Sequence, residues 1–205
     1  MENLAVKLLC RADESIHVPP DNPACNQEGL PRMAAPVTTP PGNNLGFLTI
    51  LQEPAGAVGG YLVTNLWGRP LEFRLTSAVQ PNRVQHILYG DTLNQYLCGE
   101  LIGKTLIDKS ATPAHWLITD HPAALDLRLR VNTPVSLWIP GGPPPTLPGD
   151  PQGRGLFGHE RYPDDGALVH ELLAKLGNFD LGEPFQRIRD AIHEARKMGI
   201  GKAAA

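Results

Sequence analysis

Two stretches rich in proline and glycine limit what this chain can fold into. Residues 17–44 and residues 140–163 each contain seven of the 21 prolines. Proline lacks a backbone N–H and has a fixed φ, so it interrupts both helices and central strands. The chain is therefore predicted to divide into a helix (1–16), a linker (17–44), a compact α/β unit (45–139), a second linker (140–163), a helical hairpin (164–199) and a disordered tail (200–205).

Within residues 45–139 the hydrophobic period changes in a regular order. Three strand patterns come first, a long helical pattern follows, and two more strands alternate with a short helix. The predicted strands are 45–53, 60–65, 71–79, 114–120 and 134–140, and the predicted helices are 82–110 and 121–130.

Three consecutive strands favour an antiparallel meander, whereas strands separated by helices favour parallel crossovers. We therefore expect an α/β fold with a mixed sheet, in which the meander is followed by helix, strand, helix and strand. This order is compatible with a ribonuclease H-like topology, which is an architectural analogy and does not supply a function. The C-terminal αα-hairpin is expected to dock on the sheet or on a partner.

The long helical pattern over 82–110 is predicted to bury one face. Apolar residues recur at steps of three and four, which is the spacing of one helix face. They are Val84, Ile87, Leu88, Leu93, Leu97 and Leu101. The run of Gly90, Asp91 and Thr92 predicts a break, so that two helices meet at a bend.

Composition disfavours some classes of partner. The formal net charge is −3, so no general attraction to phosphate backbones is expected and nucleic acid is disfavoured. The longest apolar runs are far shorter than the ~20 residues that cross a bilayer, and no membrane partner is expected. Cys10, Cys25 and Cys98 form neither a CxxC pair nor an even framework, which favours a reducing compartment and a cytoplasmic location.

An enzymatic alternative follows from the ribonuclease H-like analogy. Two-metal phosphoryl chemistry needs several carboxylates that converge on Mg²⁺ or Mn²⁺. Asp120 at the end of the fourth strand, with Glu72 or Glu100, could supply them. The first strand, however, has no Asp, and its only carboxylate is Glu53 at its far end, so the central ligand of such a site is missing.

Asp120 and His121 are the best-placed polar pair in the sequence. They follow a strand of the parallel type, at the end where open α/β sheets gather ligands. Because His121 is followed by Pro122, Asp120 is also a good candidate for a helix N-cap, and capping is the favoured interpretation.

Two further pairs of polar or aromatic residues are candidate sites. Glu72 and Arg74 alternate with Leu71 and Phe73, which predicts a solvated face on which the two charges pair weakly. Trp67 and Arg69 lie in a predicted turn, and an exposed tryptophan beside an arginine is typical of the centre of a protein interface.

These patterns favour a non-enzymatic binding or scaffold protein in a cytoplasmic multi-protein assembly. The expected partner is a protein, contacted through Trp67, Arg69, Arg74 and His121, and no cofactor is expected. The alternative is a metal-dependent hydrolase or nuclease-like enzyme that uses Asp120 with Glu72 or Glu100 and binds Mg²⁺ or Mn²⁺.

Overall fold

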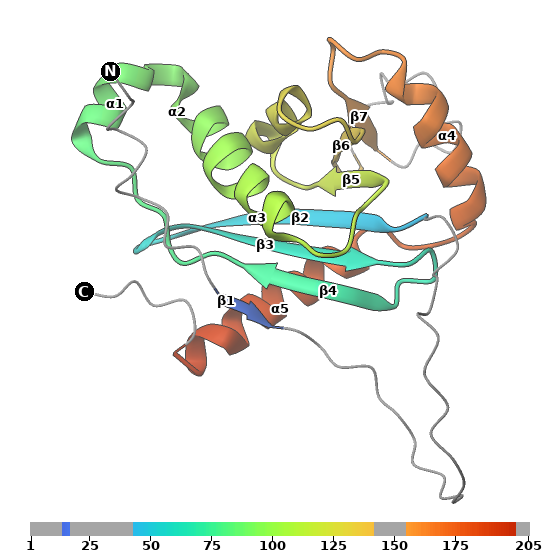
Figure 1. The fold of residues 1–205 in the computed structure, drawn as a ribbon, viewed down its shortest axis with the longest axis horizontal. Helices are drawn as coiled ribbons and strands as arrows, with labels where there is room; N and C mark the ends of the chain where they lie inside the picture. The colour runs from blue at the N-terminus through green and yellow to red at the C-terminus, as the bar shows by residue number, and fades with distance from the viewer. Residues whose placement is uncertain (1–13, 17–42, 142–154, 200–205) are drawn as a thin grey trace, which may run out of the picture.

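A seven-stranded mixed sheet runs through the computed structural model, which describes residues 14–16, 43–141 and 155–199 (Figure 1). Its strand order is β1-β4-β3-β2-β5-β6-β7. The strands are β1 (Glu14–Ile16), β2 (Leu45–Glu53), β3 (Gly56–Thr64), β4 (Pro70–Leu75), β5 (Trp116–Thr119), β6 (Val135–Trp138) and β7 (Leu156–Gly158).

The central five strands have the predicted connectivity. β2, β3 and β4 form an antiparallel meander, β5 then pairs in parallel with β2, and β6 pairs in parallel with β5. The mixed α/β fold class is therefore confirmed, and the strand order remains compatible with the ribonuclease H-like analogy. The two short outer strands, β1 and β7, pair antiparallel with β4 and β6.

Helices cover both faces of this sheet (Figure 1). On one face, the helices after β4 and β5 enclose a core that includes Leu48, Tyr61 and Ile102. On the other face, the C-terminal helices enclose a core that includes Phe47, Trp116 and Phe185. The helices are α1 (Arg83–Tyr89), η1 (Gly90–Thr92), α2 (Leu93–Gln95), η2 (Tyr96–Lys104), α3 (Thr105–Lys109), η3 (Pro122–Leu129), α4 (Asp165–Leu176) and α5 (Glu183–Lys197).

Two adjacent glycines in β3 allow helices to approach both faces. A Cβ on Gly59 would clash with Ile102 of η2, and a Cβ on Gly60 would clash with Ile188 of α5. Successive residues of a strand point to opposite faces, so the pair Gly59–Gly60 clears space on both sides of β3. Close packing of the sheet between η2 and α5 depends on these two positions.

Two predicted segment boundaries need correction. Glu14–Ile16 falls within the predicted N-terminal helix but forms β1, because it pairs with Leu75, Arg74 and Phe73 of β4. Leu156–Gly158 falls within the predicted linker 140–163 but forms β7 on the edge of β6. Most of the other residues in the predicted N-terminal helix, the two linkers and the tail lie outside the described residues.

The prediction that Glu72 and Arg74 lie on a solvated face of β4 is also wrong. Glu72 is only 6% exposed, and the Arg74 side chain is 18% exposed. Strand alternation correctly separates Glu72 from Phe73, but helices cover both faces of the sheet, so Glu72 and Arg74 form a largely buried polar pair at the edge of an apolar core.

The long helical pattern after β4 is interrupted, as predicted, at Gly90–Thr92. Beyond the break, the chain forms η2, a π-helix over Tyr96–Lys104, where Leu97 and Ile102 are buried. Before the break, however, α1 has no buried residue. The prediction of one continuous buried face is therefore wrong for Val84, Ile87 and Leu88, which are all exposed.

The predicted C-terminal helices are α4 and α5, and both dock on the sheet. α4 contributes Val169 and Leu173 to the same core as Phe185 and Ile188 of α5. Arg128 of η3 forms a two-point ion pair with Asp165, with distances of 2.6 and 3.0 Å, which fixes the start of α4. In the part of the chain that is described, no helix is long and apolar enough to cross a membrane.

Candidate functional site

Asp120 directly follows the end of β5, beside the middle of the parallel strand β2. The register of β2 and β5 pairs Leu48 with Thr119, so the next residues, Thr49 and Asp120, are also neighbours. The hydroxyl of Thr49 contacts both carboxylate oxygens of Asp120, at 2.6 and 2.8 Å. Arg189 of α5 completes the cluster through an ion pair with Asp120. The carboxylate therefore joins β2, β5 and α5.

This environment shifts the pKa values of Asp120 and His121 in opposite directions. Burial raises the pKa of Asp120, while the Thr49 hydrogen bond and the Arg189 charge offset part of that rise. Burial lowers the pKa of His121, against the opposing effect of the Asp120 charge. The cation that compensates Asp120 is the guanidinium of Arg189, which a metal ion would have to displace.

The favoured interpretation of Asp120 as a helix cap is wrong. His121 occupies the N-cap position of η3, with no side-chain hydrogen bond to the helix. Its backbone N–H donates to the Thr119 hydroxyl at 3.2 Å, while its Nδ1 is buried without a hydrogen-bond partner among the described residues. Asp120 instead anchors α5 to the sheet.

Glu72 holds the loop between α3 and β5. Its carboxylate accepts hydrogen bonds from the Ser110 hydroxyl at 2.9 Å and from the backbone N–H groups of Ala111 and Thr112 at 3.0 and 2.7 Å. Arg74 donates from Nε at 2.5 Å. Burial alone would raise the pKa of Glu72, but these donors outweigh it and hold the pKa at about 2. Arg74 is therefore engaged inside the protein and is not presented to a partner.

The three carboxylates of the enzymatic alternative do not come together. Two strands, β3 and β2, separate β4 from β5, which places Glu72 and the end of β5 about 14 Å apart at the usual strand spacing. Glu100 lies on η2 and forms an ion pair with Arg130. Within the described residues, no group of three or more His, Cys, Asp or Glu side chains could hold a metal ion.

Trp67 lies in the turn between β3 and β4 and is 85% exposed. The Asn65 side chain accepts hydrogen bonds from the backbone N–H groups of Trp67 and Arg69, both at 3.0 Å. From α5, Arg187 donates to the carbonyl of Gly68 at 2.9 Å. The backbone of the turn is thus held in place while Trp67 and Arg69 face solvent.

Gly68 lets the turn pack closely on the segment before α5. Its φ is +76°, a backbone conformation that residues other than glycine rarely adopt. A Cβ at this position would lie 2.7 Å from the ring of Phe179. The sequence predicted the turn from Gly68 and Pro70. It did not predict the supporting contacts, because Phe179 and Arg187 are more than a hundred residues away in the chain.

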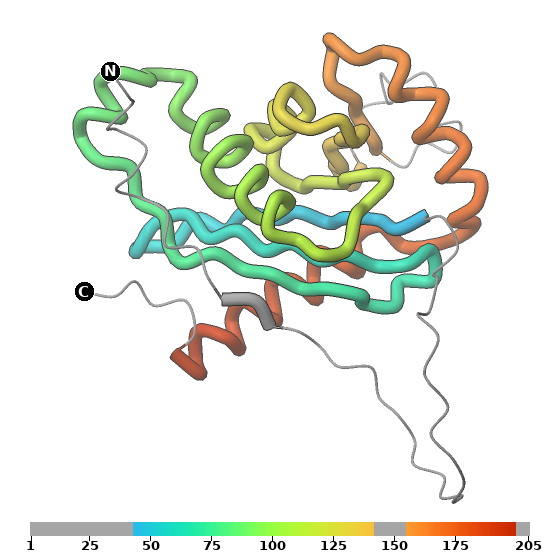
Figure 2. Tube along the Cα trace, in the orientation of Figure 1, coloured from blue at the N-terminus to red at the C-terminus, as the bar shows by residue number. Residues whose placement is uncertain are grey.

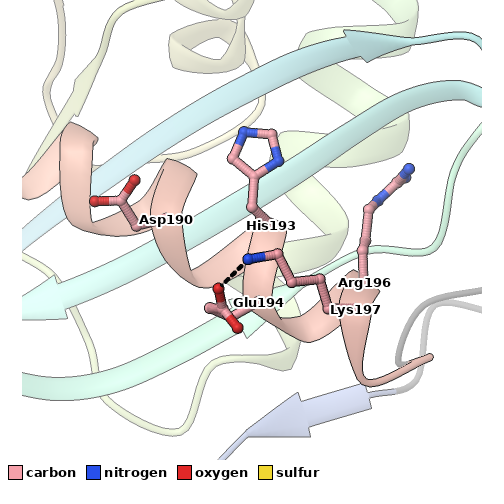
Figure 3. A pocket seen from close by; sticks show the side chains of 5 residues that line it. All are labelled: Asp190, His193, Glu194, Arg196 and Lys197. Carbon is pink, nitrogen blue, oxygen red and sulfur yellow. Dashed lines mark hydrogen bonds and ion pairs between the residues drawn. The ribbon is translucent and has the colours of Figure 1, made fainter.

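Two surface hollows were not predicted from the sequence. One, of about 690 Å³, lies along α5 and is lined by Asp190, His193, Glu194, Arg196 and Lys197 (Figure 3). Its charges are largely paired, because Lys197 contacts Glu194 at 2.5 Å and Arg196 forms an ion pair with Glu53. This hollow therefore presents a balanced polar surface with no excess of one charge.

The second hollow, of about 290 Å³, lies between the helices after β4 and η3. Tyr89 and Tyr96 line it as a stacked pair with ring centroids 4.1 Å apart, next to the Glu100–Arg130 ion pair. It borders α1, whose apolar side chains are exposed.

The exposure of the α1 face could not be predicted from the sequence. A helical period predicts which residues share a face, but it carries no information on whether another element covers that face.

Comparisons of the chain with protein-family models, with curated proteins and with solved structures give no match.

Proposed function

We propose that the chain is a non-enzymatic α/β binding or scaffold protein, which acts within a cytoplasmic multi-protein assembly. A protein partner binds the β3–β4 turn, with Trp67 as the main contact and Arg69 beside it. The observation that carries this proposal is that Trp67 is 85% exposed on a turn whose backbone is contacted by Asn65, Arg187 and Phe179.

The support around Trp67 favours binding for an energetic reason. Interface hot spots are enriched in Trp and Arg, and a binding surface that is already ordered loses less conformational entropy on association. Asn65, Arg187 and Phe179 order the turn in the free protein. Trp67 itself contributes little to the core, so a binding role accounts for a side chain that packing does not explain.

The surroundings of the acidic residues also support a non-enzymatic role. Glu72, Glu100 and Asp120 each form an ion pair with a different arginine, namely Arg74, Arg130 and Arg189. The competing metal-dependent hydrolase requires these carboxylates within one ligand shell. It predicts that Mg²⁺ or Mn²⁺ raises the unfolding midpoint of the wild type but not of Asp120→Asn, whereas the binding proposal predicts equal midpoints with and without metal in both proteins.

The binding proposal is tested by placing a photo-crosslinking amino acid at Trp67 in the native cell, with the same replacement at Leu168 as the control. Leu168 is 53% exposed on α4 and belongs to no proposed site. We expect a covalent adduct with a defined protein from the first position only.

The affinity of that purified protein is then measured for the wild type and for Trp67→Ala. Loss of a hot-spot tryptophan costs 2 kcal/mol or more, so we expect at least about a thirtyfold weaker complex. Unchanged affinity, or adducts of equal yield from both positions, would contradict the proposal.

A further inference from the structure

The helix α1 carries an apolar face that no described element covers. Val84, Ile87 and Leu88 are 61%, 73% and 75% exposed, and their spacing of three and four places them on one side of the helix. Scattered exposed apolar residues are common, but a contiguous patch of them on one helix is typical of a surface that binds another element.

The helix itself is well formed at both ends. Asn82 and Gln85 make a reciprocal capping box, with both hydrogen bonds at 2.9 Å. At the other end, Tyr89 stacks on Tyr96 of η2. The apolar face therefore belongs to an ordered helix with a fixed connection to the body of the protein.

The register of β1 indicates which segment can reach this face. β1 runs antiparallel to β4, with Glu14 opposite Leu75, the last residue of β4. The chain that precedes Glu14 and the chain that leaves Leu75 for α1 are consequently at the same end of the sheet, where Figure 2 shows α1. Ile87 is only twelve residues along the chain from Leu75.

Residues 1–13 lie outside the described residues, but their sequence suits the face. Leu4, Ala5, Leu8 and Leu9 recur at positions i, i+1, i+4 and i+5, with Lys7 off this stripe. Thirteen residues can span at most about 45 Å when extended, so α1 is within their reach.

We propose that residues 1–13 of the same chain bind the apolar face of α1, with Leu4, Leu8 and Leu9 against Val84, Ile87 and Leu88. The size of the face favours this occupant over a second copy of the chain. A stable interface between separate proteins buries about 800 Å² on each partner, far more than three side chains on a seven-residue helix provide. A tethered segment needs less area, because its effective concentration is in the millimolar range.

The cysteine at position 10 provides a direct test in the full-length chain. Ile87→Cys is made in a Cys25→Ser background, and Cys98 is retained because it is fully buried. The matched control is Leu168→Cys in the same background, which places an exposed thiol on α4. Both proteins are oxidised at low concentration, and disulfides are mapped by mass spectrometry.

We expect an intramolecular disulfide between Cys10 and the thiol introduced at position 87. It should form at least about tenfold faster than in the Leu168→Cys control, because a docked segment holds Cys10 beside α1 whereas a merely tethered one does not. Adding Leu8→Asp should remove this advantage, while Lys7→Asp should leave it. The introduced thiol replaces an exposed side chain, and unchanged thermal unfolding verifies the fold of each variant.

Three results would overturn the proposal. Equal rates for the two thiols would mean that residues 1–13 do not dock on α1. Disulfide-linked dimers of Ile87→Cys would assign the face to a second copy. An unchanged rate after Leu8→Asp would mean that Cys10 lies near α1 for a reason other than the apolar contact. None of these results bears on Trp67, which lies at the opposite end of β4.

Discussion

The two ends of β4 both expose apolar side chains, but they are supported in different ways. At the β3–β4 turn, Trp67 projects from a backbone that is held by Arg187 and Phe179. At the other end, α1 has no residue buried in the body of the protein. Exposure alone therefore does not distinguish a prepared binding surface from a surface that lacks its cover. The difference lies in what supports each end: residues far along the chain hold the β3–β4 turn, whereas α1 is held by its own capping box and by the stacking of Tyr89 on Tyr96.

The largest expected effect on stability comes from weakening the packing of α5, the helix that supports the β3–β4 turn. Phe185 of α5 is fully buried, between Trp138, which stacks on it at 5.5 Å, and Phe47, which meets it edge-on at the same distance. Phe185→Ala should lower the free energy of unfolding by about 3–5 kcal/mol, measured by chemical denaturation. The control Leu168→Ala should change it by less than about 0.5 kcal/mol. Similar values for both would mean that α5 does not anchor this end.

The next effect concerns Glu72, which ties β4 to the loop before β5. Glu72→Gln should cost about 1–3 kcal/mol at neutral pH, because Arg74 and the loop donors lose a charged acceptor.

The pH dependence of this effect has a definite sign. The folded-state pKa of Glu72, about 2, is below the ordinary value of 4.5, so its contribution is present above pH 4.5 and is lost as the pH falls towards 2. Wild-type stability should therefore fall more steeply than that of Glu72→Gln over this window. Parallel curves in acid denaturation would contradict the assignment of Glu72 as the charged anchor.

A smaller effect is expected from Arg187→Ala, which removes the hydrogen bond to the carbonyl of Gly68. Because Arg187 is partly exposed, the loss of stability should be only about 1 kcal/mol. Hydrogen exchange of the amides in residues 66–69 should nevertheless quicken, and the Trp67 partner should bind more weakly although Trp67 is intact. Glu183→Ala, which removes only the exposed i,i+4 partner of Arg187, serves as the control.

The smallest effect on global stability is expected at α1. Asn82→Ala removes one half of the capping box and should weaken the helix by about 1 kcal/mol. Hydrogen exchange of the α1 amides should therefore quicken several-fold, while the midpoint of global unfolding stays constant, because α1 buries no residue in the core. A drop of several degrees in the midpoint would show that α1 is coupled to the core and would remove the contrast between the two ends.

Local sequence patterns predicted the elements better than the sites. β2 spans the predicted residues 45–53, and the break after α1 falls at the predicted Gly90. Asp120 was recognised as well placed, but its partners Thr49 and Arg189 are 71 and 69 residues away in the chain. Contacts at such separations leave no periodic signal, so the interpretation of Asp120 as a cap followed from its local sequence alone.

The sequence by itself determined the order of the elements from β2 to β6, the separation of Glu72 from Phe73 on β4 and the position of the Trp67 turn. These features depend on backbone preferences and on periods of two and of about 3.6 residues, which operate over a few neighbours. Only the tertiary structure decided that Glu72 is buried, that Asp120 binds Arg189 and that the apolar face of α1 is exposed. Burial and pairing depend on which distant segments pack together, and the same amphipathic pattern is compatible with a covered face and with an open one.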